Sequence, residues 1–220
     1  MLTYKIKEMD IVIAGGHGKI AMLLHPILKE KGHTVKGLIR NEEQADDLRK
    51  AGAEPVVVDI EKEEDISEFV GEADAVVFAA GAGPGSGKER KWSVDRDGAI
   101  KLIEAAKKNG IERYVMISAM GLETPRGDEV FQVYQQAKLQ ADKALRNSGL
   151  NYIIVKPGRL TNDEGTGKVK IAEKLDRGEI PREDVARVIA EVLEDQSIED
   201  VEFDLLSGED EISVALQEFV

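Results

Sequence analysis

A tyrosine, a lysine and a serine have the residue types and spacing of an acid–base site. Tyr134 and Lys138 lie four residues apart in Glu129–Arg146, whose pattern predicts a helix, so both side chains are expected on one face. A nearby ammonium group lowers the pKa of a tyrosine, which is about 10 in a free side chain. Such a tyrosine can exchange a proton with a carbonyl oxygen while a hydride moves at the carbon. Ser118 ends an apolar stretch and can hydrogen-bond the same oxygen.

A structural role for Tyr134 is the alternative interpretation. Val130, Tyr134, Ala137, Ala141 and Leu145 form an apolar stripe, which is typical of a helix face that packs on a core. The spacing of Tyr134 and Lys138 therefore indicates an acid–base site only when other features of such a site accompany it.

A glycine motif near the N-terminus is one such feature. Gly15, Gly18 and Ala21 are spaced three apart between a predicted strand, Asp10–Ala14, and a predicted helix, Lys19–Lys31. The first glycine permits a tight turn, the second lets a pyrophosphate approach the backbone, and the small third residue lets the helix pack closely. The free amides at the helix start favour phosphate. A glycine-rich turn without a ligand is the alternative. The candidate cofactor-binding residues of this loop are Gly15, His17, Gly18, Lys19 and Ile20.

The residue after the second predicted strand bears on which dinucleotide binds. Sites specific for NAD usually carry an acidic residue here, whereas this chain has Arg40, which can stack on adenine and pair with a 2′-phosphate. Lys19 and His17 can add to the same pocket. We therefore expect NADP(H) in preference to NAD(H). In the alternative interpretation Arg40 is a surface charge neutralised by Glu42 and Glu43.

A second glycine cluster, Ala82–Glu89, superficially matches a phosphate-binding loop of ATPases. Its last position should offer a hydroxyl to magnesium, but Glu89 stands there, and a carboxylate repels phosphate. The regular helical pattern also begins only at Gly98. The sequence therefore predicts no ATP site, and the small residues before the cluster are interpreted as a wall against the dinucleotide. These candidates are Ala79, Ala80 and Gly81.

The elements that must position these residues alternate along the chain. The predicted strands are Asp10–Ala14, Thr34–Ile39, Pro55–Val58, Ala75–Ala80, Arg113–Ser118, Tyr152–Val155 and Val201–Leu206. The predicted helices are Lys19–Lys31, Glu42–Ala51, Gly98–Lys108, Glu129–Arg146 and Arg182–Glu194. Strands that are apolar throughout and separated by helices indicate a parallel sheet covered on both faces. Right-handed crossovers then give a doubly wound, three-layer α/β fold of the Rossmann type.

Two stretches depart from this alternation. The acidic stretch Asp59–Glu68 is interpreted as a solvated helix face. Leu160–Ile180 carries few signals and is expected to be irregular, so we predict residues 157–180 to be a substrate or lid segment over the crevice. The whole chain, residues 1–220, is expected to form one domain.

Composition excludes several classes of protein. The 220 residues carry a net charge of −13, which argues against binding to a nucleic-acid backbone. No cysteine is present, so disulfides and thiolate metal sites are excluded. The sequence has no apolar run of membrane-spanning length, and MLTYKIKEMD lacks a signal-peptide core. His17, His25 and His33 are too scattered for a metal site. We expect a cytoplasmic protein that handles a small molecule, as a monomer or homodimer.

Together these residues resemble the short-chain dehydrogenase/reductase superfamily, and within it the atypical, NmrA-like group of NAD(P)-binding proteins. The resemblance covers nearly the whole chain. The motifs that carry it are Gly15–Ala21, Arg40, Asp59-Ile60, Ala79-Ala80-Gly81, Asp95-x-x-Gly98, Leu102–Ala106, Ser118, Tyr134 with Lys138, Lys156-Pro157-Gly158 and Ile180–Ala186.

The resemblance implies a role for several of these residues. Tyr134 is implied as the acid–base group, Lys138 as the ligand of the nicotinamide ribose, and Ser118 as the partner of the substrate oxygen. Asp59 and Ile60 are implied beside adenine, and Pro157 beside the carboxamide. Asp95 stands where many relatives have asparagine.

Three functions are compatible with these features. The first is an NADP(H)-dependent reductase of a small carbonyl, quinone or flavin-like acceptor. The second is a regulatory protein that senses NADP(H) without turnover. The third is an epimerase or dehydratase that binds its cofactor tightly and recycles it.

Overall fold

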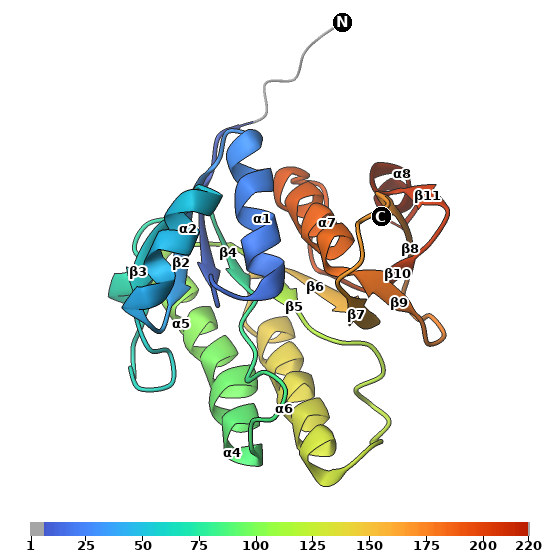
Figure 1. The fold of residues 1–220 in the computed structure, drawn as a ribbon, viewed down its shortest axis with the longest axis horizontal. Coiled ribbons are helices and arrows are strands. Elements are labelled where there is room, and N and C mark those ends of the chain that lie inside the picture. Colours follow the sequence, from blue (N-terminus) through green and yellow to red (C-terminus); the bar gives the residue numbers. More distant parts are fainter. Residues whose placement is uncertain (1–6, 220) are drawn as a thin grey trace, which may run out of the picture.

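A computed structural model describes residues 7–219 and shows a doubly wound α/β fold (Figure 1). A nine-stranded sheet has the order β11-β8-β10-β6-β5-β4-β1-β2-β3. The strands from β3 through β1 and β4 to β10 are parallel, and β8 and β11 continue the sheet in antiparallel fashion. A separate pair, β7 and β9, is parallel. The three-layer Rossmann-type fold expected from the sequence is confirmed.

The strands are β1 (Asp10–Ala14), β2 (Thr34–Ile39), β3 (Glu54–Val57), β4 (Ala75–Phe78), β5 (Arg113–Ile117), β6 (Asn151–Pro157), β7 (Arg159–Thr161), β8 (Lys168–Ala172), β9 (Glu179–Pro181), β10 (Val201–Ser207) and β11 (Asp210–Glu211). The helices are α1 (Lys19–Glu30), η1 (Glu42–Gln44), α2 (Ala45–Ala51), α3 (Ser67–Val70), α4 (Lys88–Arg90), η2 (Lys91–Gly98), α5 (Ala99–Asn109), α6 (Glu129–Arg146), α7 (Arg182–Glu194) and α8 (Ile212–Phe219).

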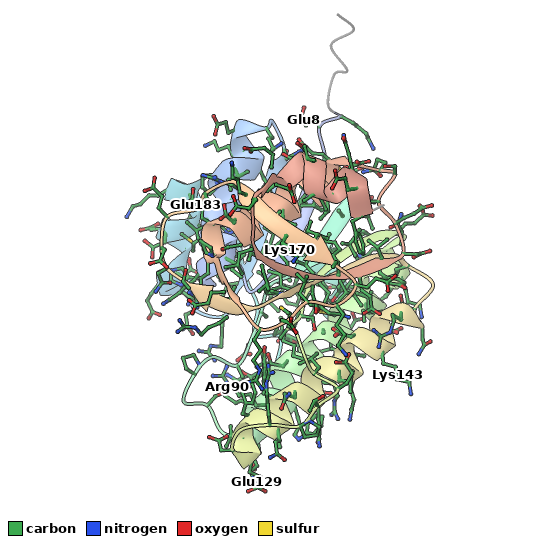
Figure 2. All side chains as sticks on the ribbon, turned by 90° about the vertical axis from the view of Figure 1, so that its right-hand side faces the viewer. Glu8, Arg90, Glu129, Lys143, Lys170 and Glu183 are labelled. Atoms are coloured by element: carbon green, nitrogen blue, oxygen red, sulfur yellow. The ribbon has the colours of Figure 1, made fainter. Side chains whose placement is uncertain are left out.

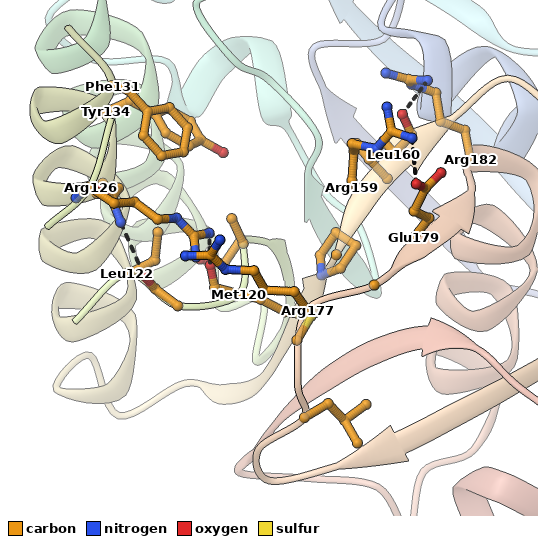
Figure 3. A pocket seen from close by; sticks show the side chains of 18 residues that line it. Met120, Leu122, Arg126, Phe131, Tyr134, Arg159, Leu160, Arg177, Glu179 and Arg182 are labelled. Carbon is orange, nitrogen blue, oxygen red and sulfur yellow. Dashed lines mark hydrogen bonds and ion pairs between the residues drawn. The ribbon is translucent and has the colours of Figure 1, made fainter. Parts of the chain in front are cut away.

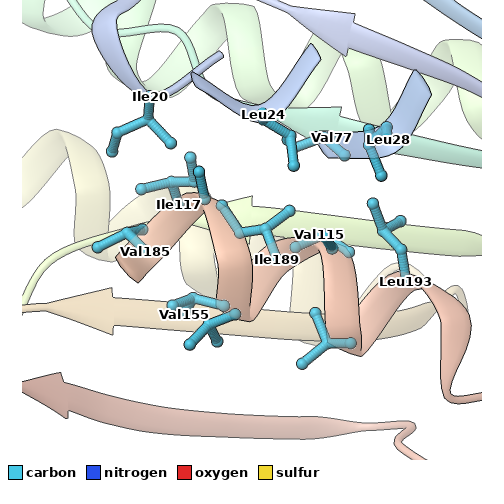
Figure 4. Packing of buried hydrophobic residues seen from close by; sticks show 14 of the residues in the cluster. Ile20, Leu24, Leu28, Val77, Val115, Ile117, Val155, Val185, Ile189 and Leu193 are labelled. Carbon is cyan, nitrogen blue, oxygen red and sulfur yellow. The ribbon is translucent and has the colours of Figure 1, made fainter. Parts of the chain in front are cut away.

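Apolar residues form one core on each face of the sheet. Within β1, Ile11 and Ile13 belong to one core while Val12 and Ala14 belong to the other, because successive strand side chains point to opposite faces. On the first face, α1 and α7 pack side by side, with Ile20, Leu24 and Leu28 of α1 facing Val185, Ile189 and Leu193 of α7 (Figure 4). On the second face lie α3, α5 and α6.

Three sequence-based expectations about elements were wrong. The acidic stretch Asp59–Glu68 forms turns that lead only into the short α3, because its charged residues provide no apolar face for a longer helix. Helical structure begins at Lys88 rather than Gly98, since α4, the π-helical η2 and α5 are continuous. Of the two features that spoke against an ATP site, only the carboxylate of Glu89 is left.

The expected irregular segment is partly regular, which is the third correction. Lys168–Ala172 pairs with β10 and extends the main sheet, with Val169 fully buried. The strand was overlooked because exposed lysines alternate with its apolar residues. The flanking parts of residues 157–180 form β7 and β9 and lie outside the main sheet.

Strand order reverses between β1 and β4, and this arrangement positions the site. Consecutive strands add outward from β1 toward β3, and the chain then crosses to β4 on the other side. Ligands of open α/β sheets bind in the crevice at this reversal, beyond the carboxyl ends of the strands.

Charged side chains are distributed over the periphery of the fold, with exposed Lys143 on α6 and exposed Lys170 on β8 (Figure 2). Within residues 7–219 no helix is long and apolar enough to cross a membrane. Most of the stretch MLTYKIKEMD, for which a signal peptide was not expected, lies in residues 1–6, outside the described residues. The expected single domain, residues 1–220, begins and ends at residues that also lie outside the described ones.

Candidate cofactor and substrate site

A cavity of about 210 Å³ lies at the carboxyl ends of β1 to β4. The structure brings nine predicted cofactor-binding residues together in its wall: Gly15, His17, Gly18, Arg40, Asp59, Ile60, Ala79, Ala80 and Gly81. The remaining lining residues were not singled out from the sequence: Leu38, Ile39, Gln44, Val58, Glu61, Arg90 and Val94.

The glycine loop fits a dinucleotide because its backbone approaches the neighbouring strands closely. Gly15 has a φ of +82°, and a Cβ there would lie 2.6 Å from the Cα of Ala80. A Cβ on Gly16 would lie 2.7 Å from the Cα of Gly37. Helix α1 begins immediately after extended Gly18 without a side-chain cap. The first-turn amides, including those of Lys19 and Ile20, therefore lack intrahelical partners and can bind phosphate.

His25 fixes this loop from beneath, which sequence reasoning missed. Its Nε2 lies 2.7 Å from the carbonyl oxygen of Gly16, and its side chain is fully buried in α1. Burial lowers the pKa of His25, so the neutral ring donates the Nε2 proton to that carbonyl. The only sequence signal was a histidine on the apolar face of the helix that follows the motif.

Two arginines share one glutamate at the adenosine end of the cavity. Arg40 Nη1 lies 3.6 Å from Glu61 Oε2, and Arg90 donates from Nε and Nη2 to the same carboxylate at 3.1 and 2.7 Å. The Arg90 and Ser93 hydrogen bonds outweigh burial and lower the pKa of Glu61. The alternative interpretation had Arg40 neutralised by Glu42 and Glu43. In the structure the carboxylate partner of Arg40 is instead Glu61.

His17 is directed toward the second helix rather than toward the arginines. Its Nε2 lies 3.0 Å from Asp47 Oδ2, and its Nδ1 lies 3.3 Å from Gln44 Nε2. It lines the cavity while held by two polar side chains, so the loop conformation is tied to η1 and α2.

A larger cavity of about 670 Å³ opens beyond β5 and β6 (Figure 3). It brings together Ser118 and Tyr134, two predicted catalytic residues, with Pro157, which was predicted to lie beside the cofactor. Leu160, Leu175 and Glu179, all from the predicted lid segment, line its other side. Both cavities lie at the carboxyl edge of the sheet, because the smaller one is lined by residues that follow β4 and the larger one by residues that follow the parallel neighbour β5.

Tyr134 does not have the lowered pKa expected from its spacing to Lys138. Burial, together with the negative charges of Asp95 and Asp142, raises the pKa of Tyr134 well above its ordinary value. Lys91 Nζ lies 5.5 Å from the centre of its ring and donates to the Gly83 carbonyl oxygen. Tyr134 is therefore a protonated phenol in the cavity wall, not a tyrosinate.

Lys138 is buried behind the cavity and does not line either one. Its Nζ donates to the carbonyl oxygen of Ile117 at 3.0 Å and lies 3.7 Å from Asp95 Oδ1. Its ammonium also lies 5.4 Å from the centre of the Phe78 ring. These internal partners explain why the shared helix face does not produce the expected effect on Tyr134.

Ser118 is paired with an aspartate that sequence reasoning missed. Ser118 Oγ donates to Asp142 Oδ2 at 2.7 Å, and Asp142 is only 1% exposed. Burial raises the pKa of Asp142 to about 6, although this hydrogen bond and nearby cations oppose the shift. The available signal was its spacing, since Tyr134, Lys138 and Asp142 recur every four residues along α6.

A model of a family described as NAD(P)H-binding matches residues 15–196. The chain belongs to this family. That match confirms the resemblance to the NmrA-like group of atypical short-chain dehydrogenases/reductases. Because the match spans both cavities, NAD(P)H binding is a property of the family to which the site belongs.

Relatives and solved structures support this membership. The chain is 38% identical over 212 residues to the uncharacterized sugar epimerase YhfK of Bacillus subtilis (strain 168), covering 95% of this chain and 99% of that protein. A solved structure from Bacillus halodurans, named as an NAD-dependent epimerase/dehydratase, is 41% identical with a TM-score of 0.89, covering 95% and 99% of the two chains. The oxidoreductase ylbE of Lactococcus lactis is 25% identical with a TM-score of 0.85, covering 96% of each chain.

Proposed function

We propose that the protein is an NADP(H)-dependent oxidoreductase that transfers a hydride between nicotinamide and a small carbonyl, quinone or flavin-like acceptor. The observation that carries this proposal is the pair of cavities at the carboxyl edge of the sheet. One has the glycine loop of a dinucleotide site, and the other presents Ser118 and Tyr134 where an acceptor would lie. The name of the similar Lactococcus lactis protein, an oxidoreductase, supports the same class of reaction.

The preference for NADP(H) is supported by the guanidinium groups at the adenosine end. Arg40 and Arg90 place two guanidinium groups there, both paired with Glu61, and Asp59 is a second carboxylate in the same wall. Guanidinium groups bind phosphate through paired, charge-assisted hydrogen bonds. A 2′-phosphate beside them therefore gains interactions that the free hydroxyl of NAD(H) lacks.

The cofactor, when bound, supplies or accepts the hydride. Tyr134 holds its proton at neutral pH because burial raises its pKa, so it can donate that proton to an acceptor oxygen. This assignment favours reduction over oxidation. Ser118, which follows β5, would turn its hydroxyl from Asp142 to the same oxygen, and Lys138 positions this strand end through the Ile117 carbonyl oxygen. Lys138 is thus a positioning residue in this proposal.

The test is oxidation of NADPH with a panel of aldehydes, quinones and flavins by the wild-type protein and Tyr134→Phe. Loss of a general acid lowers turnover by about 100-fold or more, and we expect an unchanged Kd for NADPH. Tyr152→Phe, outside both cavities, is the matched control and should retain wild-type turnover.

Two outcomes would contradict the proposal in different ways. Unchanged turnover in Tyr134→Phe would remove Tyr134 from the mechanism but leave hydride transfer. Binding of NADPH without oxidation by any acceptor would exclude the oxidoreductase and favour the NADP(H)-sensing protein.

An epimerase or dehydratase is the second candidate, because two similar proteins carry those names. Such a reaction returns the hydride to the same substrate, so the cofactor must stay bound between steps. Retention of nicotinamide through gel filtration of the purified protein would favour it. The raised pKa of Tyr134 is less suited to the base that abstracts a hydroxyl proton in such a cycle. A cytoplasmic location and a monomer or homodimer stay predictions.

A further inference from the structure

Positive charge gathers in the wall of the larger cavity, although the chain as a whole carries −13. The residues that line it include four arginines and a single acidic residue, Glu179: Arg126, Arg159, Arg177 and Arg182. The arginines come from three separate parts of the chain: the loop after β5, residues 159–177 and the start of α7. A cationic cavity in an acidic protein focuses anions into the site.

Most of this charge is not neutralised within residues 7–219. Arg159 is paired with Glu179. Arg182 donates only to neutral oxygens, those of the Leu160 and Thr161 carbonyls and the Asn162 amide. Arg126 and Arg177 have no carboxylate within 4.0 Å among the described residues. The contacts of Arg126 are the Met120 carbonyl oxygen at 3.4 Å and the Phe131 ring at 5.9 Å.

The loop that carries Arg126 is held in place by a buried side chain. Gln135 of α6, which is 2% exposed, accepts from the Arg126 amide at 2.9 Å. The same side chain donates to the carbonyl oxygens of Gly121 and Thr124, each at 3.0 Å. One buried amide thus holds the loop at three points, so Arg126 is presented from a defined backbone.

The segment that carries Arg177 is anchored in the same manner. Asp204 Oδ2 of β10, which is largely buried, accepts from the Leu175 amide at 2.9 Å. The Gly178 carbonyl oxygen accepts from the Arg159 amide at 2.9 Å. Two hydrogen bonds therefore fix the backbone on either side of Arg177.

Arg126 and Arg177 extend toward one another from opposite walls of the cavity (Figure 3). Two guanidinium groups of like charge repel one another unless an anion lies with them. We infer that the cavity takes an acceptor with an anionic group, a carboxylate or a phosphate, held by Arg126 and Arg177. This inference rests on the proposed function, since it names the class of acceptor that reaches Ser118 and Tyr134.

The experiment measures binding without turnover. Benzaldehyde, 4-carboxybenzaldehyde and 4-formylphenyl phosphate are titrated by calorimetry into the protein loaded with NADP⁺, which cannot reduce them. We expect both charged compounds to bind at least about tenfold more tightly than benzaldehyde, since a hydrogen bond to a charged group is worth about that factor. The comparison of the two charged compounds shows whether carboxylate or phosphate is preferred.

Three variants test which residues provide the preference. In Arg126→Gln and in Arg177→Gln the preference for charged compounds should fall about tenfold. Arg49→Gln removes the same charge from exposed Arg49 on α2 and should keep the wild-type preference. An unchanged Kd for NADPH in each variant shows that the fold is retained.

Equal binding of charged and neutral aldehydes, or no binding of the charged compounds, overturns the inference. Retention of the preference in both Arg126→Gln and Arg177→Gln also overturns it. Failure of the proposed function is distinguishable, because it appears as absent NADPH oxidation while the binding preference is present.

Discussion

At the scale of single residues, the site depends on buried polar groups whose partners lie elsewhere in the chain. Asp142 accepts a hydrogen bond from Ser118, Lys138 contacts Asp95, and His25 holds Gly16. Oδ1 of Asp95 and of Asp142 has no hydrogen-bond partner among the described residues. Buried groups of this kind destabilise a fold, and they are retained where chemistry or positioning requires them.

Asp142 should make stability depend on pH. Because its pKa is raised to about 6, the folded state binds the proton more tightly than the unfolded state. The stability that this proton provides is complete below the ordinary pKa and is lost as pH rises through about 6. We expect Asp142→Asn to avoid this loss, so its free energy of unfolding relative to wild type rises by up to about 3 kcal/mol between pH 4 and pH 8.

Urea unfolding of dilute protein at a series of pH values measures this difference. Asp46→Asn, which changes an exposed carboxylate on α2, serves as the control and should show little pH-dependent difference. A difference between Asp142→Asn and wild type that stays constant with pH would mean that Asp142 is ionised as readily in the folded protein as in the unfolded one.

The sequence predicted which residues gather at the site better than it predicted their protonation. Gly15, Arg40 and Tyr134 lie where a strand–loop–helix pattern indicates, because local periodicity and strand order determine such positions. The pKa of Tyr134 depends on burial and on Asp95, which is 39 residues earlier in the chain. Spacing along one helix carries no information about such a neighbour.

At the scale of elements, helices α1 and α7 form the layer that supports the glycine loop. Ile189 of α7 is fully buried between α1 and the strands β5 and β6 (Figure 4). Ile189→Ala removes buried methyl groups and leaves a cavity, so we expect the free energy of unfolding to fall by about 2–5 kcal/mol. Denaturant titration measures the loss.

Val214→Ala is the matched control, because Val214 is exposed on α8 and its truncation should change stability by less than about 0.5 kcal/mol. Equal effects of the two substitutions would contradict the assignment of the α1–α7 interface as a principal core.

Elements of the parallel sheet were predictable because each is an apolar run between helical patterns. Strand β8 was not predictable, since it pairs in antiparallel fashion with β10, more than 30 residues later. Continuity of α4, η2 and α5 was also missed, because glycine and charged residues obscure the helical period in Lys88–Gly98.

At the scale of the whole molecule, an acidic protein places arginines in the walls of both cavities, with an excess of positive charge at the larger one. Arg40 and Arg90 lie at the smaller cavity, and Arg126 and Arg177 lie at the larger one. The net charge of −13 gave no sign of this distribution, because composition is an average over the surface. The two arginine pairs are consistent with a cofactor and an acceptor that both carry anionic groups.

The most direct test of the account is a parallel titration of the protein with NADPH and NADH, followed by nicotinamide fluorescence. We expect NADPH to bind at least about tenfold more tightly, and we expect Arg40→Gln to remove most of this preference while Arg49→Gln retains it. Equal binding of the two cofactors would contradict the assigned role of Arg40 but keep the glycine loop. Binding of neither would contradict the central claim that this loop holds a nicotinamide dinucleotide.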